Sequence, residues 1–397
     1  MTRHLQSNIW KYTLILVTNK RVFLAILGAY YLTIPTVTPQ WIGTILLVSS
    51  IAGFLFEIPS GYFADKFGHK ETLVIARFLM ILSSFFLLIA NNVYVLMLGG
   101  IFMSLSMAFH SGTGSAFMHE TLRALGREKD YSKVMGKASS IGFAVPVVLM
   151  VLVPLLVGIS YKLPFLIGLI LDTVGLITAL LLVKPPVTPG HVEEVGMTNF
   201  REVVREGHRL HYFRYAIFMG IITGTLVAVG VFRAPYQVLL DIPVIWFGVF
   251  LGLGRAIASL MLAYSGKLHV YFKDIHAFQS FMLVIFAVQI FLLGILTSPW
   301  IVVTLFITIN AFQWGLSQVG SSFLLEIIKD SKFKATLLSV PAQVDMAASA
   351  VLSFILGVAI EHFSYQSGFL TIAIFFVVIL IPLYLYIQRN KSGLAQN

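Results

Sequence analysis

Long apolar stretches, separated by short polar breaks, run along almost the whole chain. Hydrophobic residues make up 58% of the 397 residues, charged residues only 11%, and the mean hydropathy is +0.90. A soluble domain carries about 25% charged residues. Because backbone groups find no water in a bilayer, only helices and closed barrels can cross it. These stretches are apolar on every face and do not alternate, so we predict an all-α membrane protein.

A helix of about 20 apolar residues spans a bilayer, and the chain contains twelve such candidate spans. We predict them at residues 20–37, 41–64, 71–91, 93–121, 134–158, 163–184, 212–235, 243–265, 276–296, 299–326, 335–360 and 364–388. The polar break between the sixth and the seventh has apolar residues at 200, 203, 204 and 210, a spacing that predicts an interfacial amphipathic helix. We therefore expect an N-terminal six-helix bundle (1–184), a cytoplasmic linker (185–211) and a C-terminal six-helix bundle (212–397).

The two halves share an internal similarity. In the first half, the segment Ser115–Glu120 precedes a basic loop and then Lys133–Ser140. In the second half, Ser322–Glu326 precedes a basic loop and then Lys334–Val340. Each pair lies at the connection between the fourth and fifth predicted spans of its half. The repetition predicts two pseudo-symmetric bundles, an arrangement common in secondary transporters.

The basic residues predict the orientation in the membrane. Of the 27 lysines and arginines, only Lys162 lies in a predicted outer loop, and Arg77, Arg233 and Arg255 lie within predicted spans. All the others, including Arg21, fall on the side of the two termini. By the positive-inside rule, both termini are cytoplasmic. The same one-sided distribution explains the net charge of +10 without nucleic-acid binding. The N-terminus lacks a small-residue cleavage site, so we expect no cleaved signal peptide.

A motif follows the second predicted span. Gly61, Asp65, Lys66, Gly68 and Lys70 match the pattern Gly-x-x-x-Asp-(Arg/Lys)-x-Gly-Arg-(Arg/Lys), with His69 in place of the usual arginine. This loop resembles the signature between the second and third helices of the major facilitator superfamily. The resemblance implies two six-helix halves and transport by alternating access. It also implies that these five residues form a conformational latch at the cytoplasmic face. We include Arg77, at the start of the third span, and expect it to pair with Asp65 or Glu57. The alternative is a tight charged loop with no switching role.

Ionisable and polar residues inside predicted spans are candidates for substrate or ion binding, because burying them in a membrane is costly. Arg255 must face water, a carboxylate or an anionic ligand, and Asp345 is a candidate partner for it or a proton carrier. Asp172 has no evident role. For each of the five remaining candidates, the alternative to ligand or ion binding is a structural role: anchoring a helix end, snorkelling to the membrane interface, or hydrogen bonding between helices. The remaining candidates are Glu57, His110, Arg233, Asn310 and Gln313.

Two departures from subgroups of the resembled family bear on coupling. The early fourth span reads Leu98–Ile101 and lacks the arginine of many proton-coupled members, and the fifth span lacks the Gly-Pro-x-x-Gly-Gly pattern of drug–proton antiporters. Proton coupling is therefore a hypothesis that depends on Glu57, Asp345, Asp172 and His110.

These observations predict a secondary transporter of a small molecule in the bacterial plasma (inner) membrane. No Gly-x-x-x-x-Gly-Lys-(Ser/Thr) loop is present to bind ATP, so an ion or substrate gradient would supply the energy. We expect a monomer embedded in lipid, with no cofactor, no metal and no enzymatic activity; the chain has no cysteine, and its histidines are scattered. Export of small amphipathic molecules is the first hypothesis. Transport of an anionic metabolite or lipid-like molecule, suggested by Arg255 and Arg233, or uniport without protons, is the alternative.

Overall fold

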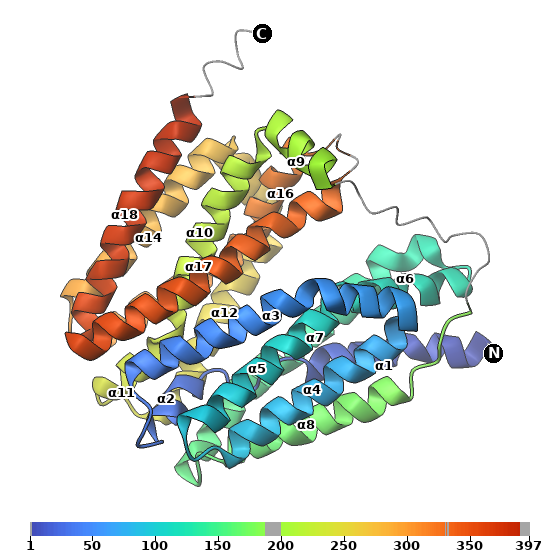
Figure 1. Cartoon of the computed structure of the whole chain (residues 1–397), viewed down its shortest axis with the longest axis horizontal. Helices are drawn as coiled ribbons and strands as arrows, with labels where there is room; N and C mark the ends of the chain where they lie inside the picture. Colours follow the sequence, from blue (N-terminus) through green and yellow to red (C-terminus); the bar gives the residue numbers. More distant parts are fainter. Residues whose placement is uncertain (1, 187–199, 330, 332, 390–397) are drawn as a thin grey trace. The chain divides into compact units, whose positions relative to one another are not determined.

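The structure, a computed structural model, describes residues 2–186, 200–329, 331 and 333–389. The described residues form helices and no strand. They divide into two compact units. Unit 1 takes in residues 1–37, 48–192 and 243–252, and unit 2 takes in residues 38–47, 193–242 and 253–397. Figure 1 shows the helices of both.

Most helices lie entirely within one of the two units. Unit 1 contains α1 (Thr2–Thr18), α2 (Leu27–Leu32), α4 (His69–Ile89), α5 (Val93–His110), α6 (Thr113–Ala124), α7 (Tyr131–Leu152) and α8 (Leu163–Leu180), with 3-10 turns at Glu128–Asp130 and Val153–Gly158. Unit 2 contains α9 (Phe200–Arg209), α10 (Tyr212–Val231), α11 (Arg233–Leu239), α13 (Ser265–Phe272), α14 (Ile275–Ile295), α15 (Pro299–Gly315), α16 (Ser317–Ile327), α17 (Lys334–His362) and α18 (Tyr365–Arg389).

Two helices are shared between the units. Helix α3 (Pro39–Phe67) begins in unit 2 and continues in unit 1. Helix α12 (Phe247–Ala263), which follows a 3-10 turn at Val244–Trp246, begins in unit 1 and continues in unit 2. The starts of α3 and α12, which correspond to the second predicted span of each half of the sequence, therefore belong to the unit formed mainly by the other half.

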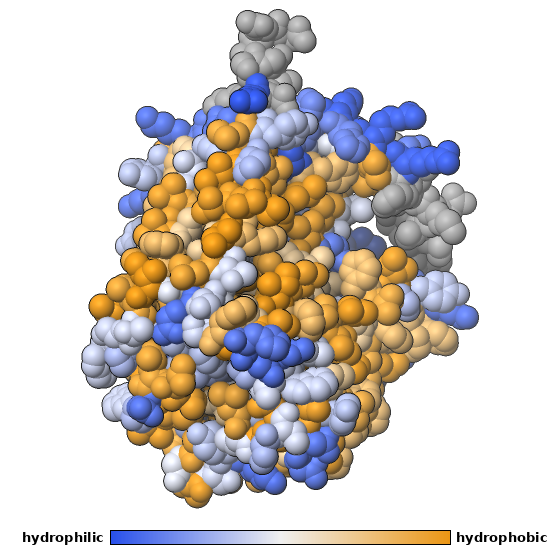
Figure 2. Space-filling model, turned by 60° about the vertical axis from the view of Figure 1, so that its left-hand side comes forward, coloured by the Kyte–Doolittle hydropathy of each residue, from blue (hydrophilic) through white to orange (hydrophobic). Residues whose placement is uncertain are grey.

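Eleven helical segments of the described residues are long and apolar enough to cross a membrane, and they coincide with the second to twelfth predicted spans. Some are two helices in series: α5 and α6 meet at Ser111 and Gly112, where Gly112 has a φ of 69°. Many large apolar side chains are exposed, Ile58 to 84%, and apolar residues cover much of the face shown in Figure 2. Patches of this extent are rare on soluble monomers, and they suit contact with lipid.

The first predicted span, 20–37, is wrong. The helix lies earlier, in α1, and the chain then breaks at residues 19–26 before the short α2. The polar N-terminal residues suggested a segment outside the membrane, but the structure gives them partners. Asn8 exchanges two hydrogen bonds with the backbone of Val183 (2.8 and 2.9 Å), and Lys11 donates to the carbonyl of Leu181 (2.7 Å).

The segment from α1 to α2 runs antiparallel to α8 along its full length. Asn8 lies beside Val183, just past the end of α8, whereas the rings of Phe23 and Tyr30 lie 4.6 and 4.2 Å from that of Phe165, near its start. Helix α8 has 18 residues and is about 27 Å long, close to the thickness of the hydrocarbon core. The broken segment therefore supplies the twelfth crossing, and the fold is that of a twelve-helix membrane protein.

A buried ion pair holds the break in this first crossing. Arg21 makes two hydrogen bonds to the carboxylate of Asp172, at 2.6 and 2.8 Å. Ser84 accepts from Arg21 (3.0 Å) and donates to Asp172 (2.5 Å). Nearby, the guanidinium of Arg77 donates to the carbonyl of Ile15 (2.8 Å) in the last turn of α1. The expectation that Arg21 is a cytoplasmic loop residue is therefore wrong: it is buried and neutralises Asp172, the residue whose role the sequence left open.

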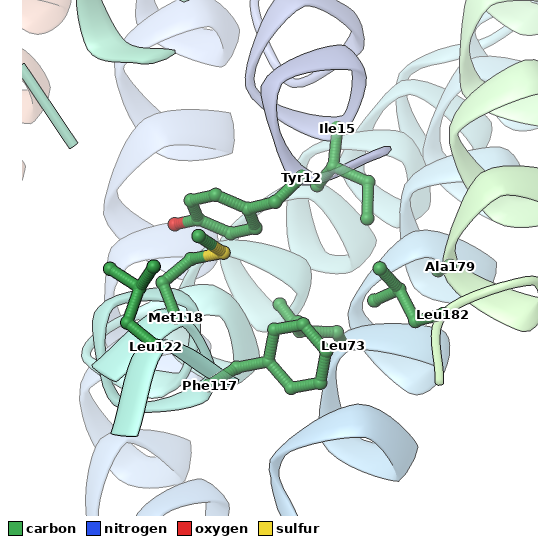
Figure 3. Close-up of a cluster of buried hydrophobic side chains, with 8 residues drawn as sticks. All are labelled: Tyr12, Ile15, Leu73, Phe117, Met118, Leu122, Ala179 and Leu182. Atoms are coloured by element: carbon green, nitrogen blue, oxygen red, sulfur yellow. The ribbon is translucent and has the colours of Figure 1, made fainter. Parts of the chain in front are cut away.

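Helix α1 is also anchored by an apolar cluster in unit 1, drawn in Figure 3. Tyr12 and Ile15 of α1 pack with residues of α4, α6 and α8. The α6 members lie at positions 117, 118 and 122, a helical spacing that places them on one side of the helix. The full cluster is Tyr12, Ile15, Leu73, Phe117, Met118, Leu122, Ala179 and Leu182.

In unit 2, glycines allow close helix packing. A Cβ on Gly224 of α10 would lie 2.6 Å from the backbone oxygen of Asp345 in α17, and one on Gly220 would lie 2.6 Å from Val344. Small residues at such crossings let helix backbones approach in membranes. The predicted amphipathic helix is observed as α9, and its Val203 is buried. The preceding linker residues 187–199 lie outside the described residues.

Replacing Asp172 by Ala should strongly destabilise the protein, because it leaves the buried Arg21 charge uncompensated. Breaking a buried ion pair in this way costs about 3–5 kcal/mol. Asp130→Ala is the matched control, since Asp130 pairs with Arg127 at 2.8 Å but is 43% exposed, and such surface pairs contribute at most about 1 kcal/mol.

Unfolding in detergent would compare the two variants, and the double variant Arg21→Met/Asp172→Leu should recover most of the lost stability. Equal stability of the Asp172→Ala and Asp130→Ala variants would show that the pair does not hold the break.

Candidate functional site

The motif loop joins α3 to α4 through a single residue, Gly68. Its φ of 106° is a conformation that side chains with a Cβ rarely adopt, and a Cβ there would lie 2.7 Å from Oε2 of Glu71. Gly61 differs, because nothing lies within 4 Å of the position its Cβ would take. Of the two motif glycines, only Gly68 is therefore required by the backbone in this structure.

The charged residues of the motif do not converge. Asp65 is exposed and has no hydrogen bond or ion pair within the described residues. The ammonium group of Lys66 lies over the rings of Tyr62 and Phe67, at 5.7 and 5.4 Å. Two other residues make contacts here. Just past the motif, Oε1 of Glu71 lies 3.0 Å from Nζ of Lys184, and within it Nδ1 of His69 lies 3.7 Å from Oε1 of Glu120. The latch role of the motif residues, including Lys70, stays a prediction.

Arg77 and Glu57 are not joined to the motif. Arg77 is 1% exposed and bonds Ile15, so in this structure it contacts neither Asp65 nor Glu57. Glu57 is half-buried in α3 and has no partner among the described residues. Close by, the hydroxyl of Ser60 bonds the carbonyls of Glu57 and Ala108, which ties α3 to α5. Arg77 thus supports the broken first crossing.

Unit 2 contains a polar group around Arg255. The guanidinium carbon of Arg255 lies 4.0 Å from the centre of the Trp314 ring. Arg255 is 9% exposed, and among the described residues it makes no ion pair. A Cβ on Gly254, the residue before Arg255, would lie 3.0 Å from Oδ1 of Asn310. This glycine therefore lets α15 pack closely against α12. That Oδ1 atom is buried and has no hydrogen-bond partner in the part of the chain that the structure describes.

The other predicted residues are dispersed. Arg233 is the first residue of α11, and its buried Nε has no partner. Asp345 is half-buried in α17 and does not form the expected ion pair with Arg255. Gln313 is half-buried on α15. His110 lies in unit 1, at the end of α5, with an unpartnered Nδ1. The structure therefore places Trp314 against Arg255 and Asn310 against the neighbouring Gly254, and Asp345 forms no ion pair among the described residues.

Sequence reasoning missed three features of this arrangement. It did not pair Arg21 with Asp172, although a charged residue in the middle of a span requires a partner. It also did not connect the ring of Trp314 with Arg255. It also passed over Glu361, whose contacts to Thr38 and Gln40 have no signal in the sequence.

The profile of the Major Facilitator Superfamily matches residues 12–332. The chain belongs to this superfamily. It is a membrane transporter of that type. The uncharacterized MFS-type transporter YxaM of Bacillus subtilis (strain 168) is 22% identical over 356 residues, which covers 87% of this chain and 86% of that protein.

Solved structures of transporters share the fold. A point mutant of the nucleoside transporter NupG superposes with a TM-score of 0.77 at 16% identity, over 96% of this chain and 98% of that one. A bacterial homolog of the human lysosomal transporter Spinster, inward-facing and unoccupied, gives 0.73 at 14% identity, over 97% and 95% of the two chains. A POT family transporter in complex with a thioalcohol-conjugated peptide gives 0.70 at 14% identity, over 98% and 96%.

The two motif glycines should respond differently to substitution by Ala. Gly68→Ala forces an unfavourable φ and a contact with Glu71, so we expect it to lower stability by about 1–3 kcal/mol. Gly61→Ala should change stability little, because its Cβ meets open space. Thermal unfolding of the two purified variants would measure the difference. If Gly61→Ala proved the more damaging, the loop would adopt another conformation for much of the time.

Proposed function

We propose that the protein is a secondary transporter that works by alternating access and carries a small amphipathic organic anion across the bacterial plasma membrane. Arg255 is the residue that binds the anionic group, and Trp314 contacts the apolar part. The proposal combines the two substrate hypotheses raised by the sequence. The observation that supports it is the buried guanidinium of Arg255, which lies on the face of Trp314 and has no ion-pair partner among the described residues.

Burying an unpaired charge in a membrane is costly. A guanidinium keeps its charge, so in the middle of a membrane span it needs water, a carboxylate or an anionic ligand. Among the described residues no carboxylate pairs with Arg255, and Asp345, the candidate on α17, forms neither an ion pair nor a hydrogen bond with it. The planar guanidinium fork suits carboxylate and phosphate groups, which it can bind with two hydrogen bonds. An anionic ligand therefore satisfies Arg255 best.

The surroundings of Arg255 favour an amphipathic ligand. The Trp314 ring is 42% exposed and presents a large apolar surface next to the charge. Its face also holds the guanidinium in place through a cation–π interaction. Asn310 adds an unsatisfied hydrogen-bond acceptor on the same helix as Trp314. An aromatic or aliphatic carboxylate with a hydrogen-bond donor matches these three groups.

Asp345 is the residue that we propose for proton coupling. It is a half-buried carboxylate in the interior of α17 without a partner among the described residues. A carboxylate in such surroundings is stabilised by protonation, and intramembrane acids form proton relays in transporters. The basic loops on the side of the termini support an orientation with both termini in the cytoplasm. Proton entry from outside would then drive export.

Arg255→Ala should weaken binding of amphipathic carboxylates at least about tenfold, because it removes charge-assisted hydrogen bonds worth about 1.5–3 kcal/mol. A panel of aromatic carboxylates, with matched amines and neutral amides, would be tested by quenching of tryptophan fluorescence. Lys267→Ala is the matched control, since it also removes a unit 2 cation that lies over an aromatic ring. Unchanged carboxylate affinity in Arg255→Ala would exclude an anion site there.

Asp345→Asn should abolish the response of transport to an imposed pH gradient while leaving substrate exchange at equal pH in place, because the amide cannot carry a proton. Flux into proteoliposomes, with and without a pH gradient, separates the two activities. Asp130→Asn, an exposed acid in unit 1, serves as the control. If flux in Asp345→Asn still responded to the pH gradient, Asp345 would not be the residue that carries the coupled proton.

A further inference from the structure

The start of α3 is packed tightly onto the end of α17 within unit 2. A Cβ on Gly43 would clash with the carbonyl oxygen of Ser353. A Cβ on Gly357 would lie 2.6 Å from the carbonyl oxygen of Pro39. Each helix thus contributes a glycine that meets the backbone of the other.

A carboxylate fastens this contact. Glu361, in the last turn of α17, accepts a hydrogen bond from the backbone N–H of Gln40 (2.9 Å) and one from the hydroxyl of Thr38 (2.5 Å). Gln40 lies in the first turn of α3, where N–H groups have no partner within the helix. A negative charge is also stabilised at a helix N-terminus by the helix dipole. The cap of α3 is therefore supplied by a residue more than 300 positions away in the sequence.

The corresponding contact in unit 1 lacks this fastening. The start of α12 packs on the end of α7, where a Cβ on Gly248 would lie 2.6 Å from the carbonyl oxygen of Met150. Gly252 similarly meets the side chain of Val151. Among the residues that the structure describes, no acidic side chain bonds the first turn of α12. The two helix starts are alike in their glycines and differ in the carboxylate.

We propose that Glu361 is a latch that holds the start of α3 on α17 in one state of the transport cycle and releases it in another. The residue is solvent-exposed, so water can replace its two hydrogen bonds and the contact is reversible. Such charge-assisted bonds are strong enough to shift an equilibrium between two states about tenfold. The proposal rests on the alternating access proposed above, and it does not depend on which substrate is carried.

The test uses Ser353 of α17, whose backbone oxygen meets Gly43 of α3, whose side chain is fully buried, and whose hydroxyl has no hydrogen-bond partner among the described residues. The chain has no cysteine, so Ser353→Cys gives a single buried thiol at this contact, and we expect a maleimide to label it faster when α3 and α17 separate. In this background Glu361→Ala should speed labelling about tenfold. Glu361→Gln should have a smaller effect, because its amide oxygen can accept both hydrogen bonds without the charge.

The control thiol is Ser83→Cys in unit 1, where the hydroxyl is likewise fully buried and unpartnered. Its labelling rate should not change with Glu361→Ala. Thr38→Val, which removes one of the two donors, provides a second and milder perturbation if Glu361→Ala folds poorly. Equal labelling of the Ser353 thiol in all of these variants, or faster labelling of both thiols, would overturn the latch. No substrate is present in this assay, so failure of the anion proposal would leave its result unchanged.

Discussion

The absence of water in the bilayer core is the constraint on which this structure depends, and the first crossing shows how it is met. A helix that stops at Thr18 leaves carbonyl groups unpaired within the hydrocarbon region. In the last turn of α1 the carbonyl of Ile15 accepts from the backbone N–H of Asn19 (3.0 Å) and also from the guanidinium of Arg77 (2.8 Å), while Arg21 pairs with Asp172. Three buried charged residues thus hold a segment that is not helical by hydrogen bonds within the protein. The break is possible because these groups are present, and their burial is tolerable because two of the three neutralise each other.

Most of the architecture was predictable because apolar length is a strong signal. Eleven spans follow directly from runs of residues that lipid accepts, and the turn at Gly68 follows from the glycine motif. The first span was misplaced because Asn8 and Lys11 are polar, and their partners lie more than 160 residues away in the sequence. Hydropathy describes a residue alone, whereas the cost of burying it depends on what it meets. Asp172 was unexplained for the same reason.

The candidate site was predictable only in part. Arg255 was identified because a guanidinium in mid-span is costly wherever it occurs, and that argument needs no structure. The expected pairing with Asp345 was an inference from opposite charge, which fixes no distance between residues on different helices. The contact with Trp314 depends on how α12 and α15 meet at Gly254, and a single glycine does not reveal which helix it faces. The sequence therefore predicted that Arg255 is a candidate residue, and only the structure shows that Trp314 contacts it.

The exchange of helix starts has a consequence for biosynthesis. Residues 38–47 leave the ribosome early, yet Glu361, which caps α3, is made more than 300 residues later. The first bundle is therefore inserted with the start of its second helix still uncapped, and unit 2 is complete only when the last helices have been translated. A gene cut at the central linker would give two fragments that each lack a short piece of their own compact unit. Co-expression of the fragments, and not either fragment alone, would restore the exchanged contacts.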